Sequence, residues 1–196
     1  MIVYYRFIRL LHLLFPTLFS HVILRIKGVR VGKRFRTCGY PMIRNYAGKN
    51  GIVIGDDVSF NSYRGANPIG GDSRLILFSM KTGRIIIGHR VGISNAAICS
   101  ANLVEIGDQT IIGGGAKIYD TDFHSTDAQH RMNGNTGIVT SPVIIGKRVF
   151  VGAHSIILKG VVIGDDAVIG AGSVVTKNIP SREIWAGNPA KFIRKV

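Results

Sequence analysis

The chain has 196 residues, of which 46% are hydrophobic and 25 are glycine, so it is long enough to bury a core within one domain and too apolar to be disordered. Its two cysteines, Cys38 and Cys99, exclude a disulfide framework, have no histidine at zinc-site spacing and favour a reducing compartment. The formal net charge of +14 comes without a recognition helix or aromatic platforms, so we expect no nucleic-acid partner.

Residues 1–27 form an apolar segment with a basic fringe. Residues 1–55 contain ten Lys or Arg and no Asp or Glu. The uncharged run between Arg9 and Arg25 spans 15 residues and includes Pro16, which is short for a membrane span, and no small-residue cleavage site follows it as a secretory signal requires. We expect a helical or broken-helical segment that caps the next domain or lies on an anionic membrane surface, and the sequence leaves both open.

A six-residue repeat begins after this segment. Its aliphatic column in the C-terminal third is Ile145, Val151, Ile157, Ile163, Ile169 and Val175. Four positions later comes a compact side chain, at Val149, Ser155, Val161, Ala167 and Ser173. The same pairs recur upstream, at Ile54 with Val58, Ile87 with Val91, Ile93 with Ala97, Ile106 with Thr110, and Ile112 with Ala116. Six is not a helical period, so each unit predicts a short strand and a tight turn with one large and one small side chain pointing inward.

Three such units would close a triangular coil of about 18 residues, and successive coils would stack as parallel strands about 4.8 Å apart. Ile87 and Ile106 are 19 residues apart, which indicates one coil plus a bulge. Cys99 follows Ile93 by six residues, so we expect it in the inward column, as part of the core rather than as a nucleophile.

Longer intervals in the repeat predict two insertions, near residues 63–83 and 119–142. The second contains most of the stretch KIYDTDFHSTDAQHR, in which His124 is the leading catalytic candidate. Imidazole has a reference pKa of about 6.5 and can accept a hydroxyl proton near neutral pH. A carboxylate on its other ring nitrogen would fix the tautomer, and either Asp120 or Asp122 stands close enough in sequence to do so.

The last 46 residues, VGAHSIILKGVVIGDDAVIGAGSVVTKNIPSREIWAGNPAKFIRKV, resemble the CoA-binding end of the hexapeptide-repeat acyltransferases. The resemblance covers about residues 29–196 and is greatest to sugar and capsular polysaccharide O-acetyltransferases, including the maltose, galactoside and colanic-acid types. It implies an all-β domain, a left-handed parallel β-helix with a protruding catalytic loop and a C-terminal CoA-binding tail, preceded by the helical segment 1–28. The left hand comes from the resemblance alone, because parallel crossovers are usually right-handed.

The resemblance also implies roles for residues of the repeat and its second insertion. His124 would be the general base, with Asp122 beside it as a catalytic residue. Asn95 would bind the acceptor sugar in a cleft shared with His124, although asparagine is also common at turns. Asp120 would contact the acceptor, and Arg131 would contact it or order the loop.

Acetyl-CoA is the implied acyl donor, and no metal is required. Small residues along the C-terminal coils would let the pantetheine arm lie close to the backbone, and basic groups would meet the phosphates. The implied cofactor-binding residues are Phe150, Ala153, Ala171, Gly172, Thr176, Lys177, Lys191 and Arg194. Phe150 stands where relatives often carry Trp, which keeps an aromatic wall without the indole N–H.

The sequence therefore predicts a bacterial acetyl-CoA-dependent O-acetyltransferase that acts on a sugar or glycan hydroxyl in polysaccharide, capsule or lipopolysaccharide biosynthesis, by direct transfer in a ternary complex. The resemblance implies a homotrimer with sites between subunits, in the cytoplasm or at the inner face of the cytoplasmic membrane. Alternatives are N-acetylation of an amino sugar and a non-enzymatic β-helix assembly module. A zinc triad of the γ-type carbonic anhydrases would need His89, His124 and His154, whose places in the repeat differ.

Overall fold

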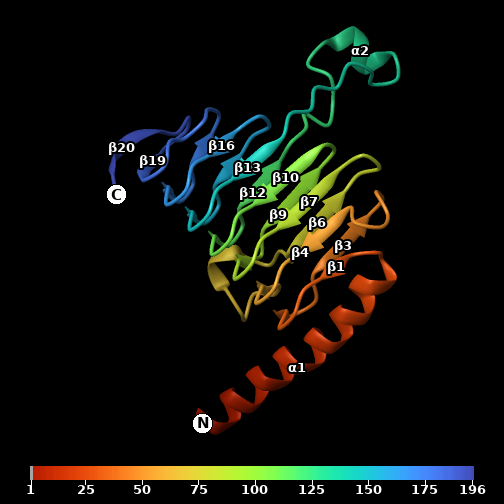
Figure 1. Cartoon of the computed structure of the whole chain (residues 1–196), viewed down its shortest axis with the longest axis vertical. Coiled ribbons are helices and arrows are strands. Elements are labelled where there is room, and N and C mark those ends of the chain that lie inside the picture. Colours follow the sequence, from red (N-terminus) through yellow and green to blue (C-terminus); the bar gives the residue numbers. More distant parts are fainter. Residues whose placement is uncertain (1) are drawn as a thin grey trace.

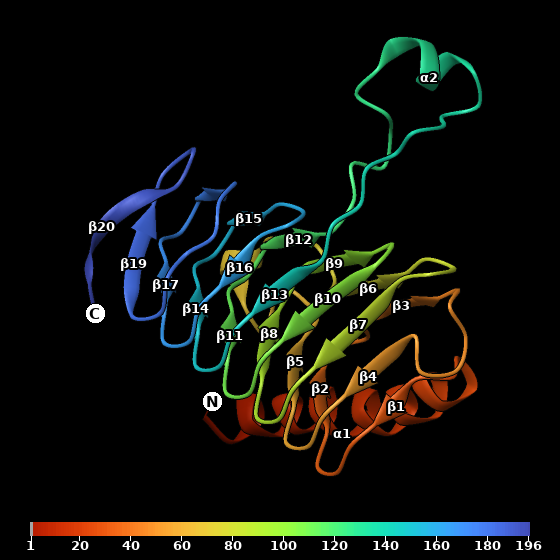
Figure 2. The same cartoon turned by 45° about the horizontal axis from the view of Figure 1, so that its top comes forward.

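The computed structural model describes residues 2–196, with side chains from residue 13 onward. Its strands form the three flat faces of a coil, and each turn of the chain adds one strand to every face (Figure 2). Within residues 2–196, paired strands run parallel except for the last pair, β19 with β20. Short strands with tight corners, as the six-residue period predicts, thus account for the domain after residue 29 apart from its two insertions.

The three faces are named sheets A, B and C in the order in which the chain visits them. Sheet A consists of β1 (Arg30–Val31), β4 (Ile52–Ile54), β7 (Arg84–Ile87), β10 (Leu103–Ile106), β13 (Val143–Ile145) and β16 (Val162–Ile163). Sheet B consists of β2 (Arg36–Cys38), β5 (Ser59–Asn61), β8 (Gly92–Ser94), β11 (Ile111–Ile112), β14 (Phe150–Val151), β17 (Val168–Ile169), β19 (Glu183–Ala186) and β20 (Lys191–Lys195). Sheet C consists of β3 (Met42–Asn45), β6 (Ile76–Ser79), β9 (Ala97–Ser100), β12 (Lys117–Tyr119), β15 (Ile156–Ile157) and β18 (Val174–Val175).

Aliphatic ladders fill the interior of the coil. In sheet A, the paired residues are Ile54, Ile87, Ile106, Ile145 and Ile163, each at most 2% exposed. The compact column is buried as well, including the hydroxyl side chains at 110, 155 and 173. Stacked side chains of one kind therefore close the core along its full length, as the repeat predicts.

The expected register is wrong at one corner. Ala96 and Ile98 are fully buried, whereas Ala97 and Cys99, which we expected to point inward, are only half-buried. The corner at Asn95 is one residue shorter than the others, because Ile98 rather than residue 99 pairs in the inward column with Ile118. Every later residue of the strand consequently faces the opposite side.

Cys99 is nevertheless unsuited to act as a nucleophile. Burial, with a smaller contribution from the nearby Asp120 carboxylate, raises the pKa of its thiol to about 11. The thiol therefore stays protonated at neutral pH, and the thiolate is the reactive form of cysteine.

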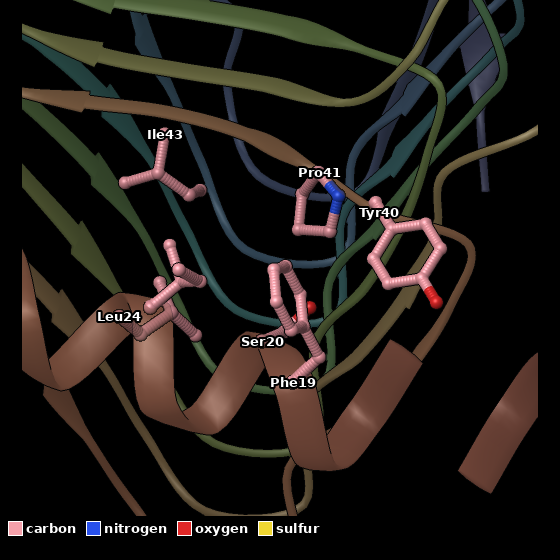
Figure 3. A pocket seen from close by; sticks show the side chains of 7 residues that line it. Phe19, Ser20, Leu24, Tyr40, Pro41 and Ile43 are labelled. Atoms are coloured by element: carbon pink, nitrogen blue, oxygen red, sulfur yellow. The ribbon is translucent and has the colours of Figure 1, made fainter. Parts of the chain in front are cut away.

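The helix α1 (Ile2–Ile26) caps the N-terminal end of this core, with Leu24 fully buried. Thr17 fixes it to the first coil, because its Oγ1 donates to the Thr37 carbonyl at 3.1 Å and accepts from the Thr37 N–H at 3.0 Å. Figure 3 shows Leu24 toward Ile43 and Phe19 beside Pro41, around a small pocket between the helix and the start of sheet C. The helix therefore packs on the first coil. No helix within residues 2–196 is both long and apolar enough to cross a membrane.

Substitutions at adjacent positions test the corrected register. Ile98→Ala should lower the free energy of unfolding by about 2–5 kcal/mol, because it removes a fully buried side chain from the ladder. Cys99→Ala should lower it by about 1 kcal/mol or less, because that side chain faces outward. Urea denaturation of both variants measures the difference, and equal losses would contradict the register.

Candidate active site

The corners of the coil form three edges, and the two insertions leave from different ones. The turns from sheet B to sheet C form the B–C edge, and those from sheet C to sheet A form the C–A edge. Residues 62–75 extend the B–C edge, and residues 120–142 extend the C–A edge. The 120–142 loop projects away from the coil and carries the short helix α2 (Ala128–Met132) at its far end (Figures 1 and 2).

The outer part of the 120–142 loop is ordered by its own side chains. The carboxylate of Asp127 accepts from the His130 N–H at 3.0 Å and so caps the N-terminus of α2. Arg131 donates from Nη1 to the carbonyls of Ser125 at 2.7 Å and Thr126 at 2.8 Å. Of its two expected roles, Arg131 therefore performs loop ordering in this structure.

His124 is exposed on the inner part of this loop, and its ring is held by Asn135. The Asn135 Nδ2 lies 3.0 Å from His124 Nδ1 and donates to the Phe123 carbonyl at 3.1 Å, while its Oδ1 accepts from the Ser125 N–H at 3.1 Å. These two backbone contacts fix the orientation of the amide. His124 Nδ1 is thus an acceptor, and the proton of the neutral ring sits on Nε2.

The two aspartates that were expected near His124 have other partners. The Asp122 carboxylate forms an ion pair with Lys159 at 2.7 Å, at the root of the loop. The Asp120 carboxylate is fully buried and accepts from Ser100 Oγ at 2.7 Å and from the backbone N–H groups of residues 101 and 102 at 2.7 and 2.9 Å. Asp120 therefore holds the preceding coil's corner, where an acceptor sugar cannot reach it in this arrangement.

Removing the Asp120 carboxylate tests this structural role. Asp120→Ala should lower the free energy of unfolding by about 2–4 kcal/mol, because it leaves two backbone N–H groups without their acceptor. The matched variant Asp127→Ala removes only the cap of an exposed five-residue helix and should change stability by about 1 kcal/mol. Thermal or urea denaturation compares them, and a fully stable Asp120→Ala protein would refute the role.

Asn95 lies on the B–C edge, away from His124. It occupies a corner with φ of +43° and is 2% exposed, since the 62–75 segment folds over it. A Cβ added at Gly70 would come within 2.6 Å of the Asn95 Cβ, and Asn95 Nδ2 donates to the Gly71 carbonyl at 3.4 Å. Sheet C separates the two edges, so the structure does not bring Asn95 and His124 into one cleft within a chain. The expectation failed because Asn95 precedes sheet C in its coil, whereas the loop follows sheet C.

The 62–75 segment covers the B–C edge as far as the corner of His154 in the last coil but one. The ring nitrogen Nε2 of His154 lies 2.6 Å from the Ile69 carbonyl, which marks how far the segment reaches along the edge. Beyond it, Ala153 is half-buried, and Ala171 and Gly172 are exposed. Successive coils pack so closely here that a Cβ added at Gly152 would lie 2.5 Å from the backbone nitrogen of Ala171. The end of this edge beyond the segment is thus open and carries small residues.

The other expected cofactor-binding residues lie on different surfaces. Thr176 and Lys177 are exposed on the C–A edge, beyond the root of the loop. Phe150 points outward from sheet B with 47% of its surface exposed, and Lys191 and Arg194 lie on the terminal strand β20. The expected CoA-binding residues therefore divide between two edges and one face of the coil.

Two residues near His124 were missed in the sequence. Lys159 stands 18 residues before Lys177, so the coil period places it directly beside the root of the loop, and this signal was available. Asn135 gave no signal, because its contact with His124 depends on how an insertion without a repeat folds back on itself.

The three histidines of a zinc triad do not converge. His89 is at a corner between sheets A and B, where its Nδ1 accepts from the Asp56 N–H at 3.0 Å, and His154 and His124 are on the other two edges. Across the part of the chain that the structure describes, no group of three or more His, Cys, Asp or Glu is placed to hold a metal ion.

Comparisons with known proteins agree with the geometry. Residues 142–177 match the family model for the hexapeptide repeat of succinyl-transferase. No curated protein matches the sequence significantly.

Solved structures match most of the chain. A maltose O-acetyltransferase from Clostridium difficile 630 is 29% identical over 90% of this chain and 74% of its own, with a TM-score of 0.51. A galactoside acetyltransferase in complex with coenzyme A is 26% identical over 89% and 68%, with a TM-score of 0.59. AntD, an N-acyltransferase from Bacillus cereus, is 24% identical over 90% and 88%, with a TM-score of 0.65, and shows the fold alone. The predicted left-handed parallel β-helix with an N-terminal helix is confirmed.

Proposed function

The chain is a hexapeptide-repeat acyltransferase by its repeat and its fold, and we propose that it transfers an acetyl group from acetyl-CoA to a hydroxyl of a sugar or glycan. The observation that carries the proposal is the exposed imidazole of His124 on a loop rooted beside Lys159 and Lys177. The two solved structures described above at 29% and 26% identity are named as a maltose O-acetyltransferase and a galactoside acetyltransferase, and the second holds coenzyme A. A base and a cationic edge are what acyl transfer from a phosphorylated thioester requires.

His124 acts as the general base in this mechanism. Its Nε2 takes the acceptor's hydroxyl proton as the oxygen attacks the thioester carbonyl, a C–O bond forms, and the C–S bond breaks. CoA leaves as a thiolate and receives the proton from the imidazolium. The resting ring carries its proton on Nε2, so Nε2 can act as a base only after the ring releases Asn135, gives this proton to solvent and takes up another proton on Nδ1.

His124→Ala tests the base. Acceptor-dependent release of free thiol from acetyl-CoA should fall by at least about 100-fold, because general base catalysis is typically worth that much. The matched variant His130→Ala removes an imidazole from the same loop, at the start of α2, and should retain activity. Thiol release with a glycan panel measures both, and wild-type rates in the His124 variant would end the proposal.

The acceptor panel also separates oxygen from nitrogen acceptors. An amino sugar belongs in it because AntD, which shares the fold, is named as an N-acyltransferase. An acetyl ester is cleaved by mild base, whereas an acetamide is stable. Mass spectrometry of the product before and after base treatment therefore identifies the atom that is acetylated.

A complete site in this proposal joins edges from two copies of the chain. His124, Thr176 and Lys177 lie on the C–A edge, whereas Ala153 and Ala171 lie on the B–C edge. In a closed ring of three chains, the C–A edge of one copy faces the B–C edge of the next. The pantetheine arm then lies along the small residues of one copy, within reach of the base of its neighbour.

Complementation between inactive variants tests the shared site. His124→Ala lacks the base, and Ala171→Trp fills the open end of the B–C edge, so each protein alone should be inactive. When they are co-expressed, random mixing leaves about a quarter of the sites with both components intact, and about that fraction of wild-type activity should return. No recovery from a mixed oligomer would place the site within one chain while leaving the role of His124 standing.

A further inference from the structure

The outer face of α1 is an apolar surface that nothing in the described chain covers. Its exposed side chains follow one another at helical spacing, whereas Pro16, Ser20 and Leu24 on the opposite face are buried against the first coil. The exposed residues are Leu14, Phe15, Leu18, Val22 and Ile26, each with at least half of its surface exposed. Single exposed apolar residues are ordinary, but five along one helix face mark a contact surface.

Basic groups border this face, and acidic ones do not. Arg25 shares an open hollow with Leu18, His21 and Val22, and Lys27 follows at the end of the helix, exposed. The first 55 residues contain ten Lys or Arg and no Asp or Glu, so no acidic side chain from the same stretch neutralises them. The face is therefore both apolar and cationic.

This combination selects one class of partner. A second copy of the chain docked on this face would bury Arg25 and Lys27 with no acidic residue of this segment to pair with them, and burying unpaired charges is costly. An anionic lipid surface supplies an apolar layer for the leucine and phenylalanine side chains and negative headgroups for the cations. Because α1 is not apolar enough to span a bilayer, it would lie in the plane of the interface.

We propose that α1 docks the enzyme on an anionic membrane surface such as the inner face of the cytoplasmic membrane, with its buried face on the β-helix and its outer face in the lipid. In Figure 1, α1 and the 120–142 loop lie at opposite ends of the view, so docking leaves the loop free. The loop leaves sheet C three coil steps beyond β3, about 14 Å at 4.8 Å per step. The docking surface and the candidate active site are thus separate parts of the chain, and the membrane proposal does not depend on the reaction.

Sedimentation with vesicles tests the docking. The full-length protein should bind vesicles of phosphatidylcholine containing about a third phosphatidylglycerol, bind pure phosphatidylcholine at least tenfold more weakly, and lose affinity as salt rises. Leu18→Glu should weaken binding to the anionic vesicles at least tenfold. Its matched control, Ile69→Glu, places the same charge at a similarly exposed apolar residue on the 62–75 segment and should bind like the wild type.

The Leu18 side chain is 70% exposed, so its replacement should leave the melting temperature unchanged and the variant folded. Phe15→Glu, on the same face, provides a second variant with the same expected loss. Unaltered vesicle binding by both variants would overturn the proposal. So would a change of oligomeric state in both variants, measured by light scattering, because it would show that a second copy covers this face.

Discussion

The structure depends on one constraint, the vertical stacking of aliphatic side chains in a coil whose turns are one strand spacing apart. Ile87, Ile106 and Ile145 pair in consecutive coils, so each packs on the residue above and the residue below. Because strands alternate inward and outward side chains, a shift of one residue would turn a whole column out of the core. The sheets are therefore intolerant of insertion, and length variation is confined to the corners, where the chain already turns.

This confinement decides where chemistry can be placed. The flat faces present short strands of alternating side chains, whereas the corners can release a loop or accept a short segment without breaking a ladder. The 120–142 loop leaves one edge, and the 62–75 segment covers part of another. Reactive and selective groups thus come to the edges, and the rigid coil sets their spacing in steps of about 4.8 Å.

The contrast between regular sheets and variable corners also explains what the sequence could predict. The ladders, the coil length and the positions of both insertions follow from a six-residue period that recurs many times, so single exceptions do not hide it. The short corner at Asn95 could not be predicted, because the residue missing there is compensated by extra residues before β10. The interval from Ile87 to Ile106 therefore stays near the length of one coil. The inward place of Ile98 rather than Cys99 is visible only when the pairing with Ile118 is known.

Within the candidate site, the place of His124 on a protruding loop could be predicted, but its surroundings could not. His124 stands out by residue type and by its place in an insertion, whereas its partner Asn135 is chosen by a loop that follows no repeat. Asp120 was predicted to lie near His124 because it looks equivalent in sequence to Asp122, two positions later. In the structure, Asp120 still belongs to the coil, whereas Asp122 pairs with Lys159 at the root of the loop. The boundary between scaffold and site thus falls between Asp120 and Asp122, and substitutions on its two sides should separate loss of stability from loss of activity.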